Sequence, residues 1–335
     1  MSEGILERLA AGPVLGDGGY LLELEKRGYV RAGPFTPEVS LTHPDALAEL
    51  HWEFLRAGAE VLQALTFYAS EEKLATVGLA GMVDELNRAA VRIARQVARE
   101  GREAGAADAL VAGNLALTWA YDPSDPASAD RVRALFDQQL EVQVAEGVDF
   151  IIGETFTWLG EALLAAERAR ATGLPVMITM AFENDPHAYE GDDAAACARK
   201  LADAGVDIVG LNCLRGPAQT LPLLAEMRAA VPGHHLAAQP VAYRTTDAAP
   251  DFTALDAFPV GLDPFQLTRA EMAEFALQAQ ALGADYIGSC CGSVAVHVRE
   301  MARALGKLPP EERTWRVDYA KPMSAYEYYG HADRV

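Results

Sequence analysis

The chain has 335 residues, half of them hydrophobic, so it can bury a large core, and its length suits either one barrel or two ordinary domains. Its 48 acidic and 28 basic residues give a formal net charge of −20, which would repel phosphate backbones and anionic headgroups. We therefore expect no nucleic-acid partner and no membrane association, and the absence of an apolar run of about 20 residues favours a soluble, cytoplasmic protein.

A repeated local pattern predicts the secondary structure. Four segments place Gly directly before a short aliphatic run: AGAEVLQALTF, EGVDFIIGETF, AGVDIVGLNC and LGADYIGSCCG. The Gly suits the left-handed position that ends a helix, and the run that follows is typical of a strand buried on both faces. Each segment is therefore interpreted as the helix-to-strand half of a βα unit.

Eight strands and eight helices are predicted along the chain. Strands are expected near residues 13–16, 58–66, 109–115, 148–154, 175–180, 206–212, 234–241 and 284–289. Amphipathic helices are expected at 43–57, 72–103, 129–146, 158–172, 191–204, 217–230, 267–282 and 293–305. This alternation favours a single-domain (β/α)₈ TIM barrel over residues 1–308. The aromatic C-terminal extension, 309–335, is expected to serve packing or association into a homo-oligomer.

The candidate site is read from the residues that end the strands. The longest irregular stretches, 17–42, 181–190 and 242–266, each follow a strand, at the face where barrel enzymes keep their sites. Asp17 follows strand one, Glu154 ends strand four, Cys213 follows strand six, and Cys290 and Cys291 follow strand eight. Because strands six and eight share one neighbour in a closed barrel, the three cysteines are expected to meet.

Three thiols at one rim suggest a metal site. Thiolates select zinc, and three protein ligands with a fourth place open to a substrate describe a catalytic site. The alternative is that Cys213, Cys290 and Cys291 are small buried packing residues, and their spacing alone leaves both interpretations open. Cys197 lies within a predicted helix, where a core (packing) or a surface role is expected.

Several segments resemble the homocysteine S-methyltransferase family, and most closely its betaine–homocysteine branch. They are GDGGYLLELEKRGYVRAGPFTPE, LTFYASEEKL, VDFIIGET, GLNC, QPVAYRT and IGSCCG, spread from about Gly16 to Leu305. The resemblance implies that Zn²⁺, held by Cys213, Cys290 and Cys291, binds L-homocysteine and activates its thiol for methylation by a small onium donor. A zinc-bound thiol is deprotonated, whereas a free thiol is mostly protonated at neutral pH.

The resemblance also implies roles for other residues at the rim. Asp17 and Glu154 would accept hydrogen bonds from the homocysteine ammonium, and the amides of Gly18 and Gly19 would hold its carboxylate. Without the family, a turn-forming Asp-Gly pair and a solvated carboxylate at a strand end are the simpler interpretations. Asn212 would orient the metal ligands or simply end a strand.

An aromatic cage for the donor is the last predicted feature. Phe35, Phe67 and Tyr68 could surround an onium group by cation–π attraction, although isolated aromatic residues more often belong to the core. The sequence departs here from the betaine branch, because Phe35 replaces a tryptophan, Leu65 a phenylalanine and Thr155 a tyrosine. Four other aromatic residues could compensate: Trp119, Tyr121, Phe156 and Trp158.

The residues at the strand ends are compatible with several functions. The leading hypothesis is methyl transfer to homocysteine, with glycine betaine as the first donor and S-methylmethionine or another sulfonium as the alternative. A non-catalytic sensor or scaffold that binds zinc or homocysteine would have the same residues at the rim but would not transfer a methyl group. A redox dithiol at Cys290 and Cys291 lacks the two intervening residues of thioredoxin-like sites, and a corrinoid or folate route would need further domains.

Overall fold

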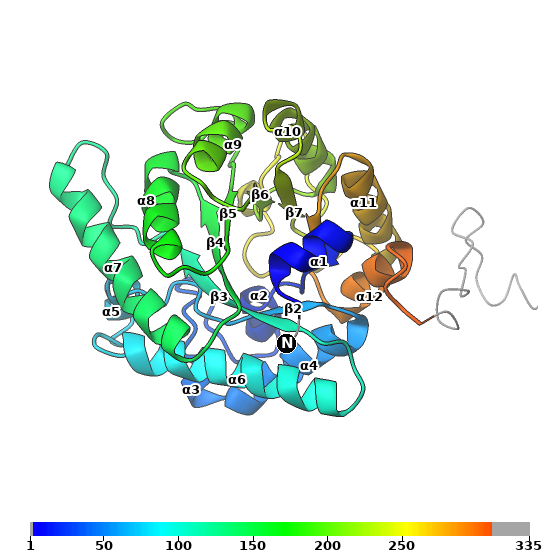
Figure 1. The fold of residues 1–335 in the computed structure, drawn as a ribbon, viewed down its shortest axis with the longest axis horizontal. Coiled ribbons are helices and arrows are strands. Elements are labelled where there is room, and N and C mark those ends of the chain that lie inside the picture. Colours follow the sequence, from blue (N-terminus) through cyan, green and yellow to red (C-terminus); the bar gives the residue numbers. More distant parts are fainter. Residues whose placement is uncertain (1–2, 310–335) are drawn as a thin grey trace, which may run out of the picture.

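The computed structural model describes residues 3–309, in which eight parallel strands form a nearly closed barrel inside a layer of helices (Figure 1). The predicted (β/α)₈ barrel is thereby confirmed. Residues 310–335 of the predicted C-terminal extension lie outside the described residues. The strands are β1 (Val14–Leu15), β2 (Val61–Gln63), β3 (Leu110–Ala116), β4 (Phe150–Phe156), β5 (Val176–Met180), β6 (Ile208–Asn212), β7 (His235–Gln239) and β8 (Tyr286–Ile287).

The strands pair in parallel in the order β1-β8-β7-β6-β5-β4-β3-β2, so the seam of the barrel lies between β1 and β2. One backbone hydrogen bond crosses the seam, from Glu60 N to Leu15 O at 2.8 Å. Two carboxylates add to it: Glu60 Oε2 accepts from Leu15 N at 2.9 Å, and Asp17 Oδ2 accepts from Gln63 N at 2.7 Å. Side chains thus satisfy backbone N–H groups that a regular ladder would pair.

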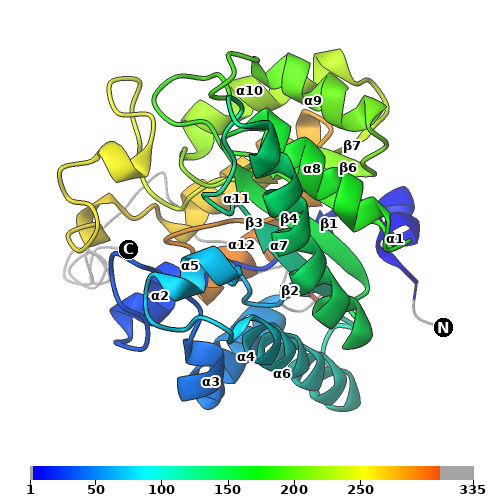
Figure 2. The same cartoon turned by 90° about the vertical axis from the view of Figure 1, so that its left-hand side faces the viewer.

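The amino-terminal end of the barrel is closed by a helix that precedes β1. Helix α1 (Ile5–Ala11) lies across the ring of strands (Figure 1), and its Ile5 and Leu9 belong to the same buried cluster as Phe150 and Met177 of the barrel interior. Seen from the side, α1 lies at one end of the molecule and α2 (Leu21–Lys26) at the other (Figure 2). The open end is therefore the one formed by the carboxyl ends of the strands, as in barrel enzymes generally.

The outer layer follows the predicted helices, with two corrections. The predicted helix at 72–103 is two helices, α5 (Glu71–Ala75) and α6 (Val83–Glu103), because Gly78 and Gly81 adopt left-handed conformations between them. The stretch 17–42 is not wholly irregular, since it contains α2 and α3 (Val39–Thr42). The other helices are α4 (Pro44–Ala57), α7 (Pro126–Ala145), α8 (Leu159–Arg170), α9 (Ala194–Asp203), α10 (Pro217–Ala230), α11 (Arg269–Ala281) and α12 (Ala295–Ala304).

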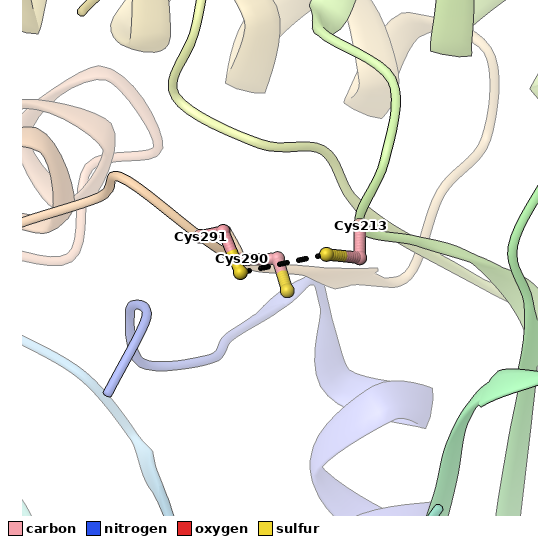
Figure 3. A group of neighbouring side chains, drawn as sticks. All are labelled: Cys213, Cys290 and Cys291. Atoms are coloured by element: carbon pink, nitrogen blue, oxygen red, sulfur yellow. Dashed lines mark hydrogen bonds between the residues drawn. The ribbon is translucent and has the colours of Figure 1, made fainter. Parts of the chain in front are cut away.

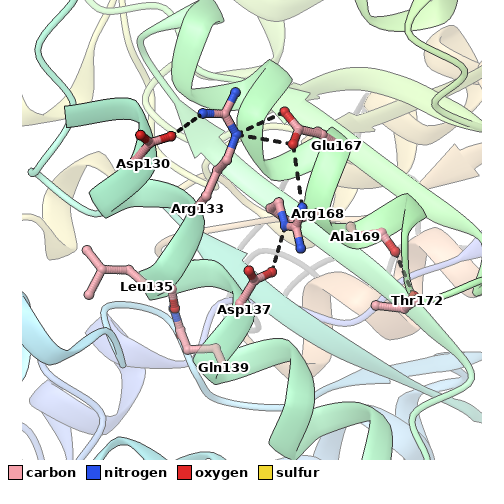
Figure 4. Close-up of polar contacts among 9 residues, drawn as sticks. All are labelled: Asp130, Arg133, Leu135, Asp137, Gln139, Glu167, Arg168, Ala169 and Thr172. Atoms are coloured by element: carbon pink, nitrogen blue, oxygen red, sulfur yellow. Dashed lines mark hydrogen bonds and ion pairs between the residues drawn. The ribbon is translucent and has the colours of Figure 1, made fainter. Parts of the chain in front are cut away.

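Neighbouring helices of this layer are joined at the surface by ion pairs. Between α7 and α8, Arg133 Nε lies 3.1 Å from Glu167 Oε1, and Arg168 Nε lies 2.7 Å from Asp137 Oδ1 (Figure 4). Because these groups are partly exposed, each pair contributes at most about 1 kcal/mol. The barrel is therefore stabilised chiefly by its buried aliphatic layers. Within residues 3–309, no helix is both long and apolar enough to cross a bilayer.

Candidate active site

Three cysteines meet at the carboxyl end of the barrel. Cys213 directly follows β6, while Cys290 and Cys291 lie in the turn after β8. The end of β7, between these strands, fixes both segments: Cys213 N donates to Gln239 O and Cys290 N donates to Pro240 O, each at 2.9 Å. Cys213 also has a left-handed φ of 57°, which is uncommon for a residue with a side chain and often marks a functional site.

The three sulfur atoms converge (Figure 3). All three Sγ atoms lie within 4.8 Å of one another, and those of Cys213 and Cys291 are 3.6 Å apart. A tetrahedral zinc with Zn–S bonds of about 2.3 Å needs sulfurs about 3.8 Å apart, so small side-chain rotations would bring this group to metal-binding geometry. The predicted meeting of the three cysteines is confirmed, and the group could hold a metal ion.

The electrostatics of the cluster favour one thiolate among the three sulfurs. Hydrogen bonds with Cys290 and Cys291 hold the pKa of the Cys213 thiol well below its usual range. The hydrogen bond with Cys213 conversely raises the pKa of Cys290 and of Cys291, and burial adds to both shifts. The proton that would be lost most easily is therefore that of Cys213. Cys197, by contrast, is buried in α9, as its packing interpretation requires.

A pocket with about 580 Å³ of atom-free space, part of it open to solvent, lies against the cysteines. Its size is that of a site for a small molecule. Of the predicted site residues, eight line it: Asp17, Gly18, Gly19, Phe67, Glu154, Cys213, Cys290 and Cys291. Strand β4 and the segments after β1, β2, β6 and β8 thus contribute these residues to one cavity, although up to 274 residues separate them in the chain.

Glu154 is a buried carboxylate held by amide side chains. Its Oε1 accepts from Gln63 Nε2 at 2.6 Å and from Asn114 Nδ2 at 2.7 Å, and its Oε2 accepts from Asn212 Nδ2 at 3.0 Å. Burial, followed by the charge of Cys213, raises the pKa of Glu154 to about 7. A cationic ligand would favour its ionised form, because an opposite charge nearby lowers the pKa of a carboxyl group.

Asn212 connects this carboxylate with the cysteines. Its Nδ2 donates to Glu154 and to Thr155 Oγ1, and lies 3.9 Å from Cys290 Sγ. Its Oδ1 accepts from Thr155 N and from Thr179 Oγ1, each at 2.8 Å. These contacts fix the side-chain amide in one orientation beside the cluster, so Asn212 does more than end a strand.

Asp17 is 3% exposed and lies in the turn after β1. Its Oδ2 accepts hydrogen bonds from Tyr20 Oη and from Gln63 N. Burial raises the pKa of Asp17 to about 6, although both hydrogen bonds oppose the shift. The side chain is thus a buried carboxylate that lines the pocket, and its role in binding stays a prediction.

The loop after Asp17 needs glycine because it packs on the cysteine segment. A Cβ on Gly19 would lie 2.6 Å from Cys290 O and 3.0 Å from Cys291 Cα, which real Cβ atoms do not tolerate. Both contacts involve backbone atoms, so neither can move aside cheaply. The lack of a side chain at Gly19 therefore allows this loop and the turn of Cys290 and Cys291 to form one wall of the pocket.

The aromatic residues predicted as a donor cage fall into two groups. Phe67 and Tyr68 are paired, with ring centroids 4.2 Å apart, and Tyr68 has Trp119 at 6.4 Å. Phe35 packs against the cluster of Tyr243 and Phe252, as Cys290 and Cys291 do, and also against the large core cluster that Phe67 and Tyr68 contact. Of the residues considered as compensating, Phe156 is fully buried against Phe136, whereas Trp119 is 65% exposed.

A cation already lies against the first aromatic group. Lys73 Nζ of α5 is 4.3 Å from the Tyr68 ring centroid and 4.8 Å from that of Trp119. Desolvation lowers the pKa of this lysine. The arrangement demonstrates that these two rings present their faces to a positive charge.

Sequence analysis missed several polar residues around the site. Gln63 was missed because β2 ends at this residue, three positions before the predicted strand end at 66, and Asn114 because it points inward from the middle of β3. Tyr20 and His51 were missed because neither lies at a strand end. A polar side chain inside an otherwise aliphatic strand, as in LVAGNLA, is the one signal that would have pointed to Asn114.

The fold and the pocket define a barrel enzyme whose site combines a three-cysteine group with two buried carboxylates at the carboxyl ends of the strands. Comparison with known proteins identifies the family. The family model of homocysteine S-methyltransferases matches residues 14–305, and the chain belongs to this family. It is accordingly an S-methyltransferase that uses homocysteine as methyl acceptor.

Relatives within the family differ in the donor that they are named for. The chain is 45% identical over 326 residues to betaine–homocysteine S-methyltransferase 1 of Mus musculus, covering 92% of this chain and 77% of the relative. It is 41% identical over 320 residues to an S-methylmethionine–homocysteine S-methyltransferase of Pongo abelii, covering 92% and 84%. Its fold resembles that of the metallated homocysteine methyltransferase MmuM of Escherichia coli, with a TM-score of 0.69, 22% identity, and coverage of 87% and 95%.

Proposed function

We propose that the protein transfers a methyl group from glycine betaine to the thiol of L-homocysteine at a Zn²⁺ ion held by Cys213, Cys290 and Cys291. The observation that carries this proposal is the convergence of the three sulfurs on a pocket that also contains Asp17 and Glu154. Zinc suits three soft thiolate ligands with one open position. A site of reduced thiols also suits the reducing cytoplasm, where we place the protein.

Each part of the pocket matches one part of homocysteine. When bound, Zn²⁺ would lower the pKa of the homocysteine thiol and keep its sulfur as a thiolate. Asp17 and Glu154 would accept hydrogen bonds from the ammonium group, and the amides of Gly18 and Gly19 would hold the carboxylate. In the transfer, a sulfur–carbon bond forms while the bond from the methyl carbon to the onium atom breaks, and that bond's electron pair stays on the donor. The products are methionine and the demethylated donor.

The donor would be held by its positive charge. Phe67, Tyr68 and Trp119 lie together, and the position of Lys73 supports the use of Tyr68 and Trp119 for a cation. An onium group loses its charge as the methyl group leaves, which a pocket of low water content favours. Phe35, which packs against the same buried cluster as Cys290 and Cys291, would cover the donor from the side of the cysteines.

A sulfonium such as S-methylmethionine is the second candidate donor. The supporting observation is that the changed positions Leu65 and Thr155 both line the pocket. A different pocket wall suits a donor of different size, and one relative is named for S-methylmethionine. A donor screen with zinc-loaded protein separates the two: turnover with S-methylmethionine and none with betaine would reverse the assignment.

Metal analysis tests the site itself. We expect the purified, reduced protein to contain one zinc per chain and Cys213→Ser to lose zinc and methyl transfer together. The matched control is Cys197→Ala, which removes a buried cysteine of α9 outside the cluster and should keep both. Full activity in the Cys213 variant would contradict the ligand assignment. Activity that survives chelation would instead favour a redox dithiol.

A further inference from the structure

His51 lies behind the site and reaches it through one tyrosine. It is fully buried in α4, and its Nδ1 is 2.9 Å from Tyr20 Oη. The same Tyr20 oxygen hydrogen-bonds to Asp17 Oδ2. The Tyr20 ring packs edge-on against Phe54 at 5.2 Å, so the phenol has little freedom to point elsewhere. His51, Tyr20 and Asp17 thus form a hydrogen-bonded relay that runs from the helix layer into the pocket.

The number of protons fixes the direction of these hydrogen bonds. An ionised Asp17 only accepts, so Tyr20 donates its single proton to Oδ2. The Tyr20 oxygen must then accept from His51, which places the His51 proton on Nδ1. Burial lowers the pKa of His51 to about 3, so the ring is neutral and its Nε2 carries no proton. Consistently, Nε2 has no hydrogen-bond partner among the described residues.

The relay acts on one oxygen of Asp17. Asp17 Oδ2 accepts hydrogen bonds from both Tyr20 Oη and Gln63 N, whereas no side chain of residues 3–309 donates to Oδ1. Two donors on Oδ2 fix the plane of the carboxylate and leave Oδ1 for a ligand in the pocket that Asp17 lines. A free carboxylate would rotate and lose part of its affinity to conformational entropy.

We infer that His51 and Tyr20 are positioning residues that hold Asp17 as an oriented acceptor for the ammonium group of homocysteine. The inference rests on the proposed role of Asp17. It assigns the relay to amino-acid recognition rather than to methyl transfer. The relay therefore affects how tightly homocysteine binds and leaves the reactivity of the bound sulfur unchanged.

Tyr20→Phe is the sharpest test because it removes only the oxygen. With the zinc-loaded protein, we expect the Kd and KM for homocysteine to rise about tenfold, the effect of one hydrogen bond to a charged group. The value of kcat and the KM for the donor should stay the same. The control is Tyr286→Phe, a fully buried phenol whose oxygen has no hydrogen-bond partner among the described residues.

A second ligand separates positioning from a general loss of structure. 4-Mercaptobutanoate has the thiol and carboxylate of homocysteine but no ammonium, so its inhibition constant should be the same in Tyr20→Phe and in the unsubstituted protein. At position 51, His51→Leu should weaken homocysteine binding, and His51→Asn, which keeps an N–H near the place of Nδ1, should restore part of it.

Two results would overturn the relay: unchanged homocysteine affinity in Tyr20→Phe, or equal weakening of homocysteine and 4-mercaptobutanoate. Failure of the proposed function looks different. In that case the unsubstituted, zinc-loaded protein would neither bind nor methylate homocysteine, and the relay would fall with it. Normal turnover combined with an unaffected Tyr20→Phe variant would reject the relay alone.

Discussion

Replacing Asp17 by Asn removes a buried charge and keeps the shape of the side chain. The amide oxygen can still accept from Tyr20 and from Gln63 N, so the hydrogen bonds across the seam survive. What changes is the cost of ionising a carboxyl group inside the protein. We therefore expect Asp17→Asn to increase the free energy of unfolding of the ligand-free protein and to abolish tight homocysteine binding.

The shift in pKa gives the magnitude. Burial raises the pKa of Asp17 from 3.8 to about 6, so the native state resists losing this proton. The stability associated with a raised carboxyl pKa is fully present below the unfolded pKa and is lost as the pH rises through the folded one. At 1.36 kcal/mol per unit, the loss is about 3 kcal/mol at pH 7.5 and about 1.5 kcal/mol at pH 5. We expect Asp17→Asn to increase the free energy of unfolding by these amounts.

Equilibrium unfolding in urea at the two pH values measures the difference, and calorimetric titration with homocysteine measures binding. The variant should be more stable at pH 7.5 by roughly twice the margin found at pH 5. A variant that is less stable at pH 7.5, or one that binds homocysteine as the unsubstituted protein does, would refute the reasoning. The first result would mean that the charge of Asp17 stabilises the fold, the second that Asp17 does not contact the ammonium.

Two further predictions concern the same wall of the pocket. Gly19→Ala should displace the turn of Cys290, because the new Cβ would lie 2.6 Å from its carbonyl oxygen; a zinc content below one per chain checks this, and full zinc with full activity would contradict it. Homocysteine affinity should fall as the pH is lowered through about 7 and then about 6, because protonation removes the charge of Glu154 and then that of Asp17; titrations from pH 5 to pH 8 measure it, and Asp17→Asn should remove the part of the fall near pH 6.

The sequence predicted the barrel because its signal is local and repeated. Gly at a helix end followed by an aliphatic run marks each βα unit, and the eight strands were found in order. The three cysteines were predicted to meet because closure of eight strands brings β6 and β8 to the two sides of β7. In these cases topology alone determined proximity.

The parts that were missed depend on contacts between distant side chains. Nothing local in the sequence around Tyr20, at the start of α2, or around His51, in α4, indicates that the two side chains meet behind Asp17. The cage of Phe35, Phe67 and Tyr68 stays a prediction, but the sequence did not indicate that Phe35 also packs against the cluster of Tyr243. Strand ends other than that of β2 could be predicted to within two residues, but the packing of loops against one another could not.

At the seam between β1 and β2, one side chain both joins the two strands and contributes to the pocket. Asp17 accepts the Gln63 amide at this edge and also lines the pocket. Asp17 therefore supplies one of three hydrogen bonds across the seam, beside the two that join Leu15 and Glu60. An asparagine at position 17 would keep that hydrogen bond and lose the charge for the ligand, whereas an aliphatic residue would lose both and leave the Gln63 N–H without this acceptor.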